Sequence, residues 1–292
     1  MTDKAYVEIT NICNLRCSFC AGHKRKFEYM EPDRFKKVLE RLDGRVKYLY
    51  LHLMGEPLTH PKLKAILDIA DSFDFRVMLT TNGTLLDKCS DILLECKKLF
   101  KISISIHAYE GNGFSKSELD DCINRALAFA EKSSARGIIT VFRLWNSGGK
   151  EFYNSHIISR LHAYSESTGF SPTPNRSGER LKDKLFIEWG ERFEWPDPDA
   201  AEKLHDDAAK ADRFCFALRD QFGILVDGTV VPCCLDHEGM LALGNILTDE
   251  LDTILQSPRA RAIYDGFTRH RAVEKYCQTC ERVRPGSRDQ HK

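Results

Sequence analysis

The sequence has no long hydrophobic segment. No run approaches the roughly 18 uninterrupted apolar residues of a membrane-spanning helix, and the first four residues lead into a strand-like segment without the apolar region of a secretory signal. It also has no net charge, because 43 basic and 43 acidic residues balance to +0. The short basic run Lys24-Arg25-Lys26 is interpreted as a solvated loop. These absences predict a cytoplasmic protein that has neither nucleic acid nor membrane as a partner.

Cysteine is plentiful, with eleven residues in 292. In a reducing compartment they are not expected to form structural disulfides. They also cluster: three lie near the start, three lie within residues 215–234, and a Cys-x-x-Cys pair ends the set at Cys280. Such close spacing indicates metal or iron–sulfur ligation.

Strand and helix patterns alternate through the first half, with no internal repeat and no low-complexity tract. Helices are expected over residues 32–42, 60–72, 84–99 and 117–135. Strands are expected over 5–9, 46–53, 75–79, 101–107, 138–144 and 185–189. This alternation predicts an α/β fold with parallel strands and right-handed crossovers, as an open sheet or a partial barrel.

The remaining segments are less regular. Residues 146–184 give no clear pattern, and Ser-Pro-Thr-Pro at 171–174 predicts a loop. Residues 194–212 contain two prolines and then a charged, helix-like run, as in a linker between two units. Beyond it, Asp227-Gly228 separates two β-branched runs within 223–231, which predicts a hairpin with a type I′ turn.

The first cysteine group, Cys13, Cys17 and Cys20, directly follows the first strand. Three thiolates in one short loop can hold three irons of a [4Fe–4S] cluster and leave the fourth iron open, which suits chemistry better than pure electron transfer. A zinc site with nearby His23 as fourth ligand is the alternative that spacing leaves open.

The Cys-x3-Cys-x2-Cys spacing, with Phe19 just before the last cysteine, resembles the signature of the radical S-adenosylmethionine (SAM) superfamily. The resemblance implies that the open iron chelates the amino and carboxylate groups of SAM. One electron then cleaves the sulfonium and yields a 5′-deoxyadenosyl radical. By the same resemblance, Phe19 lies near the adenine.

Two turns downstream resemble further motifs of that family. Gly55-Glu56-Pro57 follows the second strand and resembles its Gly-Glu-Pro motif, in which Glu56 accepts hydrogen bonds from the SAM ammonium. Thr81 and Asn82 belong to a segment that resembles the family's Thr-Asn-Gly turn. An ordinary strand-to-helix turn with an exposed glutamate is the alternative for the first motif.

The fourth strand has one polar and one apolar face, because Ser103, Ser105 and His107 alternate with isoleucines. Parallel strands are normally apolar on both faces, so the polar face indicates a lined cavity. The resemblance implies that Ser105 contacts the SAM ribose or carboxylate and that Arg143, near the end of the fifth strand, binds the carboxylate. A solvated arginine is the alternative for Arg143.

The second cysteine group comprises Cys215, Cys233, Cys277 and Cys280. Its spacing, with Gly228 five residues before Cys233, resembles the SPASM and twitch extensions of radical SAM enzymes. No cysteine follows Cys280, so one auxiliary [4Fe–4S] cluster is expected instead of two. A zinc ribbon-like site with four cysteine ligands is the alternative.

Cys234 is left over beside Cys233. Neighbours in an extended chain point to opposite sides, so Cys234 is expected to face away from the cluster and toward the substrate. We hypothesise that it is catalytic and returns a hydrogen atom to the substrate radical, as a cysteine does in some related epimerases. A packed, inert thiol is the alternative.

Together these features predict a partial (β/α)6 radical SAM barrel over residues 1–195 and a small α+β SPASM/twitch-like domain over 196–292. The expected activity is hydrogen-atom abstraction followed by dehydrogenation or epimerisation, in an oxidoreductase or epimerase that takes electrons from a flavodoxin or ferredoxin. Only twelve residues precede Cys13, which favours a small sugar or aminocyclitol over a ribosomal peptide as substrate. A non-catalytic zinc-binding or electron-transfer protein is the alternative from another class.

Overall fold

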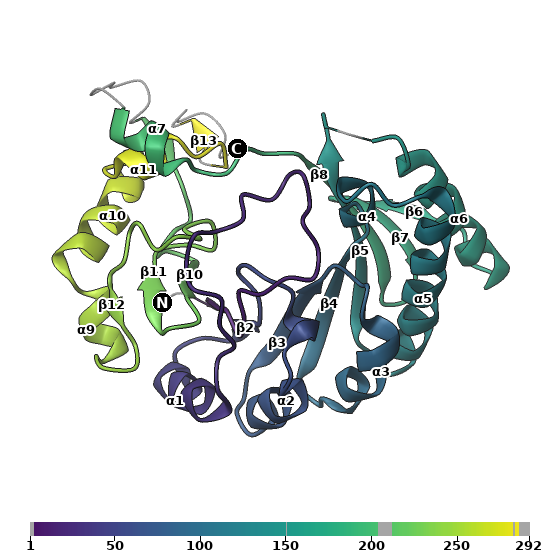
Figure 1. The fold of residues 1–292 in the computed structure, drawn as a ribbon, viewed down its shortest axis with the longest axis horizontal. Helices are drawn as coiled ribbons and strands as arrows, with labels where there is room; N and C mark the ends of the chain where they lie inside the picture. The colour runs from purple at the N-terminus through teal and green to yellow at the C-terminus, as the bar shows by residue number, and fades with distance from the viewer. Residues whose placement is uncertain (1–2, 150, 204–211, 283, 286–292) are drawn as a thin grey trace.

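The computed structural model describes residues 3–149, 151–203, 212–282 and 284–285. Its centre is a curved sheet of six parallel strands contributed by the first two thirds of the chain (Figure 1). In sheet order these are β1 (Lys4–Val7), β2 (Tyr48–Tyr50), β3 (Arg76–Thr81), β4 (Leu99–Ser105), β5 (Ile139–Ser147) and β8 (Leu185–Glu191).

Helices cover the outer, convex side of this sheet (Figure 1). They are α1 (Pro32–Leu42), α2 (Leu63–Asp71), α3 (Leu86–Glu95), α5 (Lys116–Ala135) and α6 (Asn154–Ser167). Proline at the first position favours the start of α1, and a reciprocal bond between Ser115 and Glu118 caps α5. Each helix buries one apolar face against the sheet, as Phe35, Val38 and Leu39 do in α1.

The segment without a clear sequence pattern is ordered. After α6 the chain forms β6 (Thr173–Asn175) and β7 (Gly178–Lys182), and these strands extend the sheet beyond β8 in antiparallel pairing. The prediction of a loop over residues 171–174 is therefore wrong for residues 173 and 174, which belong to β6. Side chains in β6 are exposed, so this edge strand has no apolar alternation by which the sequence could reveal it.

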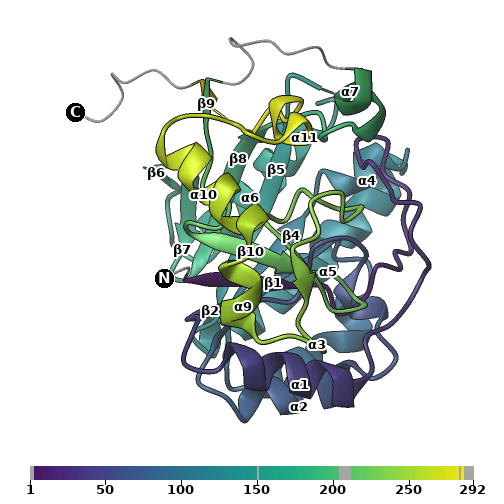
Figure 2. The ribbon, with the colours of Figure 1, turned by 90° about the vertical axis from the view of Figure 1, so that its left-hand side faces the viewer.

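The C-terminal part combines short strands and helices. They are α7 (Pro198–Lys203), β9 (Arg213–Phe214), β10 (Gln221–Ile224), β11 (Thr229–Val231), β12 (Gly244–Asn245), α9 (Leu251–Leu255), α10 (Pro258–Thr268), α11 (Lys275–Gln278) and β13 (Arg284–Pro285). Figures 1 and 2 place α9 and α10 on the outer side of β10 and β11. The helix-like run expected after the prolines begins as α7, and its continuation over 204–211 lies outside the described residues.

The predicted hairpin β10–β11 is present, but it is not a separate sheet. Strand β10 pairs in parallel with β1, and Val7 faces Ile224 in that register. This pairing covers the hydrogen-bonding edge that β1 would otherwise expose. The predicted type I′ turn is wrong: within Leu225–Gly228 only Gly228 has a positive φ, of 91°, whereas a type I′ turn needs two such residues.

The architecture confirms the predicted α/β fold, with a partial barrel of six parallel strands and a smaller C-terminal region. Within the described residues, no helix is long and apolar enough to cross a membrane. The carboxyl ends of the parallel strands all lie at one end of the barrel, where loops gather to form a site.

Candidate active site

The first three cysteines lie on the cluster loop, which we define as residues 10–28 between β1 and α1. Cys13 and Cys20 are exposed and Cys17 is half-buried. Burial raises the pKa of the Cys17 thiol to about 11, and the charges of the neighbouring Cys13 and Cys20 thiols add to this shift. Nitrogen donors approach the sulfurs: Leu15 N lies 3.4 Å from Cys13 Sγ, and Asn112 Nδ2 lies 3.0 Å from Cys17 Sγ.

The zinc alternative for these thiols rests on His23 as a fourth ligand. In the described part of the chain, no group of three or more His, Cys, Asp and Glu side chains is arranged to hold a metal ion. The Nε2 atom of His23, the suggested zinc ligand, lies 2.8 Å from the backbone oxygen of Asn11. A four-iron cluster places each thiolate on a separate iron, and the N–H groups near the sulfurs are of the kind that tune such clusters.

Glu56 joins the two downstream turns. It is 2% exposed, and its carboxylate accepts bonds from Thr81 Oγ1 at 2.7 Å and Asn82 N at 2.6 Å. Burial raises the pKa of this carboxyl to about 7. Gly55 has a φ of 74°, and a Cβ there would lie 2.6 Å from the backbone oxygen of Thr10. The Gly55-Glu56-Pro57 segment is therefore locked between the cluster loop and the turn after β3.

A small cavity of about 130 Å³ lies beside Phe19. The Phe19 ring is 5.0 Å from the His107 ring and packs on Gly111, the last residue of α4 (Ala108–Gly111). Two buried polar atoms that line this cavity have no hydrogen-bond partner among the described residues: Oε2 of Glu110 and Nε1 of Trp145. Buried polar atoms without partners are rare, so these two are suited to a polar ligand.

A larger cavity of about 690 Å³ connects the barrel interior with the C-terminal region. It is bordered by Phe19 from the cluster loop, by Ser105 from β4 and by the C-terminal cysteines. Burial lowers the pKa of His52 to about 3 and that of His107 to about 4, so both imidazoles in its wall are neutral at pH 7. Glu56 does not line this cavity.

Arg143 also lines the larger cavity. Its guanidinium stacks 3.5 Å from the Trp145 ring centroid and donates to Thr80 Oγ1 at 3.4 Å. Burial lowers the pKa of this guanidinium. Its Nε has no partner, and no carboxylate in the described chain lies within ion-pair distance. A half-buried cation in this position suits an anionic ligand group.

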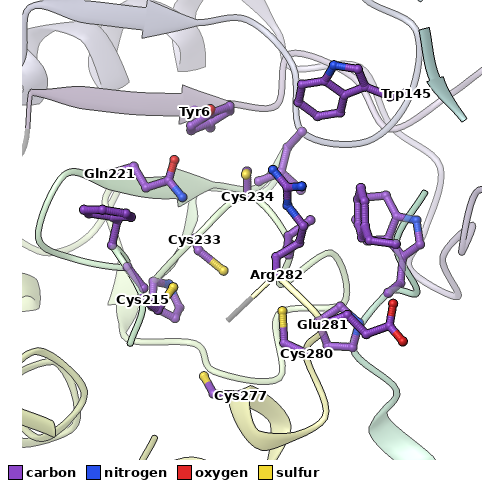
Figure 3. Close-up of a pocket in the computed structure, with 18 of the residues that line it drawn as sticks. Tyr6, Trp145, Cys215, Gln221, Cys233, Cys234, Cys277, Cys280, Glu281 and Arg282 are labelled. Atoms are coloured by element: carbon purple, nitrogen blue, oxygen red, sulfur yellow. The ribbon is translucent and has the colours of Figure 1, made fainter. Parts of the chain in front are cut away.

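The four C-terminal cysteines surround a common space (Figure 3). Cys215 lies after β9, Cys233 after β11, and Cys277 and Cys280 lie in and after α11. Burial raises the pKa of the Cys277 thiol, and the charges of Cys215 and Cys280 raise it further. The structure thus brings together residues that are up to 65 positions apart in the sequence, from Cys215 to Cys280.

Cys234 is oriented differently. Its sulfur points toward Tyr6, away from the space enclosed by the four other cysteines (Figure 3). It lines the larger cavity, and burial raises the pKa of its thiol to about 11, so the thiol keeps its hydrogen at pH 7. A protonated thiol in a substrate-sized cavity can donate a hydrogen atom.

Sequence reasoning missed Glu110 and Trp145. Both follow predicted strands, at positions where side chains gather in parallel barrels, but neither belongs to a motif. It also misjudged Arg25, whose side chain is only 14% exposed and pairs with Glu8. The interpretation of residues 24–26 as a solvated loop therefore holds for Lys24 and Lys26, which are exposed, and is wrong for Arg25. A charge run gives no signal of a partner that lies seventeen residues away.

Fold and site together define an iron–sulfur enzyme of the partial-barrel class. The radical SAM superfamily matches residues 7–149, and an iron–sulfur cluster-binding domain, SPASM, matches residues 215–281. The chain therefore carries a radical SAM domain followed by a SPASM-type iron–sulfur domain. Its radical SAM domain uses SAM and a [4Fe–4S] cluster, and its SPASM domain binds auxiliary iron–sulfur.

Curated relatives resemble only part of the chain. A tungsten-containing aldehyde ferredoxin oxidoreductase cofactor-modifying protein of Pyrococcus furiosus is 35% identical over 85 residues, 28% of this chain and 24% of that protein. A GTP 3′,8-cyclase of Microcystis aeruginosa is 32% identical over 124 residues, 39% of this chain and 37% of that protein. The chain thus spans well under half of each.

Solved structures resemble the whole chain. BtrN in complex with AdoMet and 2-DOIA has a TM-score of 0.62 and 17% identity, over 100% of this chain and 97% of that one. Streptococcus suis SuiB bound to S-adenosylmethionine has a TM-score of 0.62 and 16% identity, over 90% and 68%. At these identities the likeness establishes the fold alone.

Proposed function

We propose that this enzyme abstracts a hydrogen atom from a small molecule bound in the larger cavity and completes either an epimerisation or a dehydrogenation. The observation that carries this proposal is the composition of the cavity wall: Phe19 of the cluster loop, the thiol of Cys234 and the four other C-terminal cysteines share it. SAM bound at the first cluster supplies the 5′-deoxyadenosyl radical.

The residues that hold the first cluster and SAM form three groups in this proposal. Cys13, Cys17 and Cys20 hold the cluster, and Phe19, Glu110 and Trp145 contact the nucleoside in the small cavity. The methionine part lies along the strand ends that carry the remaining contacts, namely Gly55, Glu56, Pro57, Thr81, Asn82, Ser105 and Arg143. The neutral His107 beside Phe19 keeps this region free of a second positive charge.

The C-terminal region, which we delimit as residues 196–292, completes the site. Cys215, Cys233, Cys277 and Cys280 would ligate one auxiliary [4Fe–4S] cluster, and their arrangement around a common space in Figure 3 supports this set. Cys234 would deliver its thiol hydrogen atom to the substrate radical from its own side of the cavity, which inverts the carbon centre. The thiyl radical left on Cys234 would regain its hydrogen from one electron of the external donor and one proton. If instead the substrate radical gives one electron to the auxiliary cluster and one proton to solvent, dehydrogenation results.

The size of the cavity supports a sugar or aminocyclitol, which fills only part of about 690 Å³. A peptide residue is the second candidate, because solved neighbours include SuiB bound to precursor peptide SuiA and anSMEcpe bound to a Cp18Cys peptide. A cytoplasmic location and a flavodoxin or ferredoxin as electron donor belong to the same proposal.

The first test needs no substrate. Protein purified without oxygen should hold about eight irons and eight sulfides per chain and form 5′-deoxyadenosine from SAM and dithionite. Colourless protein that contains zinc, or reduced protein that does not cleave SAM, would end the enzyme proposal and favour a structural or electron-transfer role.

The second test uses Cys234→Ala, with Cys122→Ala in the buried face of α5 as a matched control. Both are incubated with a cellular metabolite fraction in D₂O. Epimerisation should place one solvent deuterium in the product, and Cys234→Ala should abolish this while SAM cleavage continues. A product two hydrogens lighter identifies dehydrogenation. Normal deuterated product from Cys234→Ala would refute the role of Cys234.

A further inference from the structure

A buried carboxylate lies behind both cysteine groups and belongs to neither. The Glu8 side chain, at the end of β1, is fully buried. It accepts two bonds from the Arg25 guanidinium, each 2.7 Å long, in a bidentate pair. Two backbone N–H groups complete its shell, from Met54 at 3.2 Å and Val226 at 3.0 Å. Four donors on one buried carboxylate form a strong and directional contact.

The donors come from three different segments. Arg25 belongs to the cluster loop, Met54 directly precedes Gly55, and Val226 lies in the turn between β10 and β11. Arg25 also reaches the C-terminal region itself, because its Nε donates to the backbone oxygen of His237 at 2.6 Å. One ion pair thus connects the cluster loop, the SAM-binding turn and the auxiliary hairpin.

The cluster loop depends on such polar contacts. Its cysteines are exposed or half-buried, so little apolar burial fixes its position. On the barrel side, Arg16 N donates to Asn112 Oδ1 at 2.8 Å and Ser18 N donates to Gly111 O at 2.9 Å. On the opposite side, the loop is fastened by Arg25. Figure 1 shows this loop between the barrel and the C-terminal region.

We propose that Glu8 and Arg25 are positioning residues that couple docking of the auxiliary hairpin to the SAM-binding geometry of the cluster loop. Neither residue lines the small or the larger cavity. They act because the same carboxylate holds the loop that carries the three cysteines and the backbone beside Gly55-Glu56-Pro57. The inference concerns SAM binding alone, so it does not depend on the substrate or on the reaction outcome.

Coupling of this kind is reciprocal. If the docked hairpin favours SAM binding, bound SAM must stabilise the docked hairpin by the same factor. Addition of SAM to the reduced holoenzyme should therefore slow amide hydrogen exchange in residues 221–231. The effect should disappear when the ion pair is broken. Unchanged exchange in the wild-type hairpin on addition of SAM would overturn the proposal.

The main variant is Glu8→Gln, which keeps the shape of the side chain and removes its charge. Breaking one partner of a buried pair is strongly destabilising. We expect the SAM dissociation constant to rise about tenfold or more, which corresponds to about 1.4 kcal/mol. The SAM-induced change in the EPR spectrum of the reduced first cluster should weaken in parallel, while the iron content of the holoenzyme stays at the wild-type level. Normal affinity with a normal spectrum would refute the coupling.

Asp252→Asn is the matched control. Asp252 of α9 pairs with Arg45 in the turn after α1, so this pair also joins the two parts of the chain. Both side chains are about half exposed, at 55% for Asp252 and 47% for Arg45. Such exposed pairs contribute little. The control should bind SAM like the wild type.

Two further variants separate positioning from stability. Arg25→Lys keeps the charge but loses the bidentate geometry, and should weaken SAM binding less than Glu8→Gln. The double variant Glu8→Gln/Arg25→Gln leaves no unpaired buried charge, so it should recover thermal stability. Its iron content should again equal that of the wild type, while SAM affinity stays low. Recovery of SAM affinity together with stability would show a purely structural pair and overturn the inference, even if Glu8→Gln alone does not fold.

Discussion

The substitution Gly111→Ala adds a methyl group against the Phe19 ring. A Cβ at this position lies 2.6 Å from Cε1 and 3.0 Å from Cδ1 of Phe19. Ordinary carbon contacts begin near 3.4 Å, so the ring must move by about 1 Å. Gly111 ends α4 with a regular backbone, and alanine there gains about 0.5–1 kcal/mol of helix stability over glycine.

Phe19 is half-buried and can move toward solvent, so the clash should affect SAM binding more than folding. Overpacking typically costs about 1–3 kcal/mol. If that cost falls on the nucleoside pocket, the SAM dissociation constant rises about 5- to 150-fold. The assay is an anaerobic SAM titration of the reconstituted holoenzyme, with thermal unfolding measured in parallel.

Gly113→Ala, two residues further on, should affect stability instead of SAM binding. Gly113 has a φ of 70°, and no atom lies within 4 Å of a Cβ there. Alanine should therefore lower stability by about 1–2 kcal/mol through backbone strain and leave SAM affinity unchanged. Wild-type SAM affinity in Gly111→Ala, with Gly113→Ala behaving as expected, would refute the assignment of the small cavity to the nucleoside.

Two other predictions concern iron and pH. Cys280→Ala should reduce the iron content from about eight to about four per chain and leave dithionite-driven SAM cleavage measurable, because the first cluster has its own ligands; loss of all iron would contradict independent sites. The folded pKa of Glu56, about 7, lies above its ordinary value of 4.5, so its stabilising contribution is complete below pH 4.5 and is lost as pH rises through 7. We expect the unfolding free energy of the iron-free wild type to fall between pH 5 and 8. This fall should be larger than that of Glu56→Gln by on the order of 3 kcal/mol. An equal dependence of the unfolding free energy on pH in both proteins would refute the burial of an ionisable carboxyl.

Local patterns predicted the barrel well because its elements carry regular periodicities. The helix predicted over 32–42 coincides with α1, whose proline start and buried stripe are encoded within eleven residues. The alternation of serine and isoleucine along β4 likewise predicted a polar face, and the structure places Ser105 and His107 in the cavity wall. The short, exposed strand β6 carried no such pattern and was missed.

The hairpin shows where local reasoning ends. Asp227-Gly228 correctly predicted a chain reversal, because glycine readily adopts the positive φ found at Gly228. The parallel pairing of β10 with β1 depends on two strands more than 200 residues apart and has no local signal. The partnership of Arg25 with Glu8 is similar, since nothing around a basic run indicates that one of its members is buried.

By itself, the sequence determined the family, the parallel α/β barrel and the identity of the two cysteine groups, because motif spacing and side-chain periodicity are properties of short segments. Only the tertiary structure decided that Glu110 and Trp145 line a small pocket beside Phe19 and that Glu8 connects both ends of the chain. Those arrangements depend on burial and on contacts between distant segments, which exist only after the chain has folded.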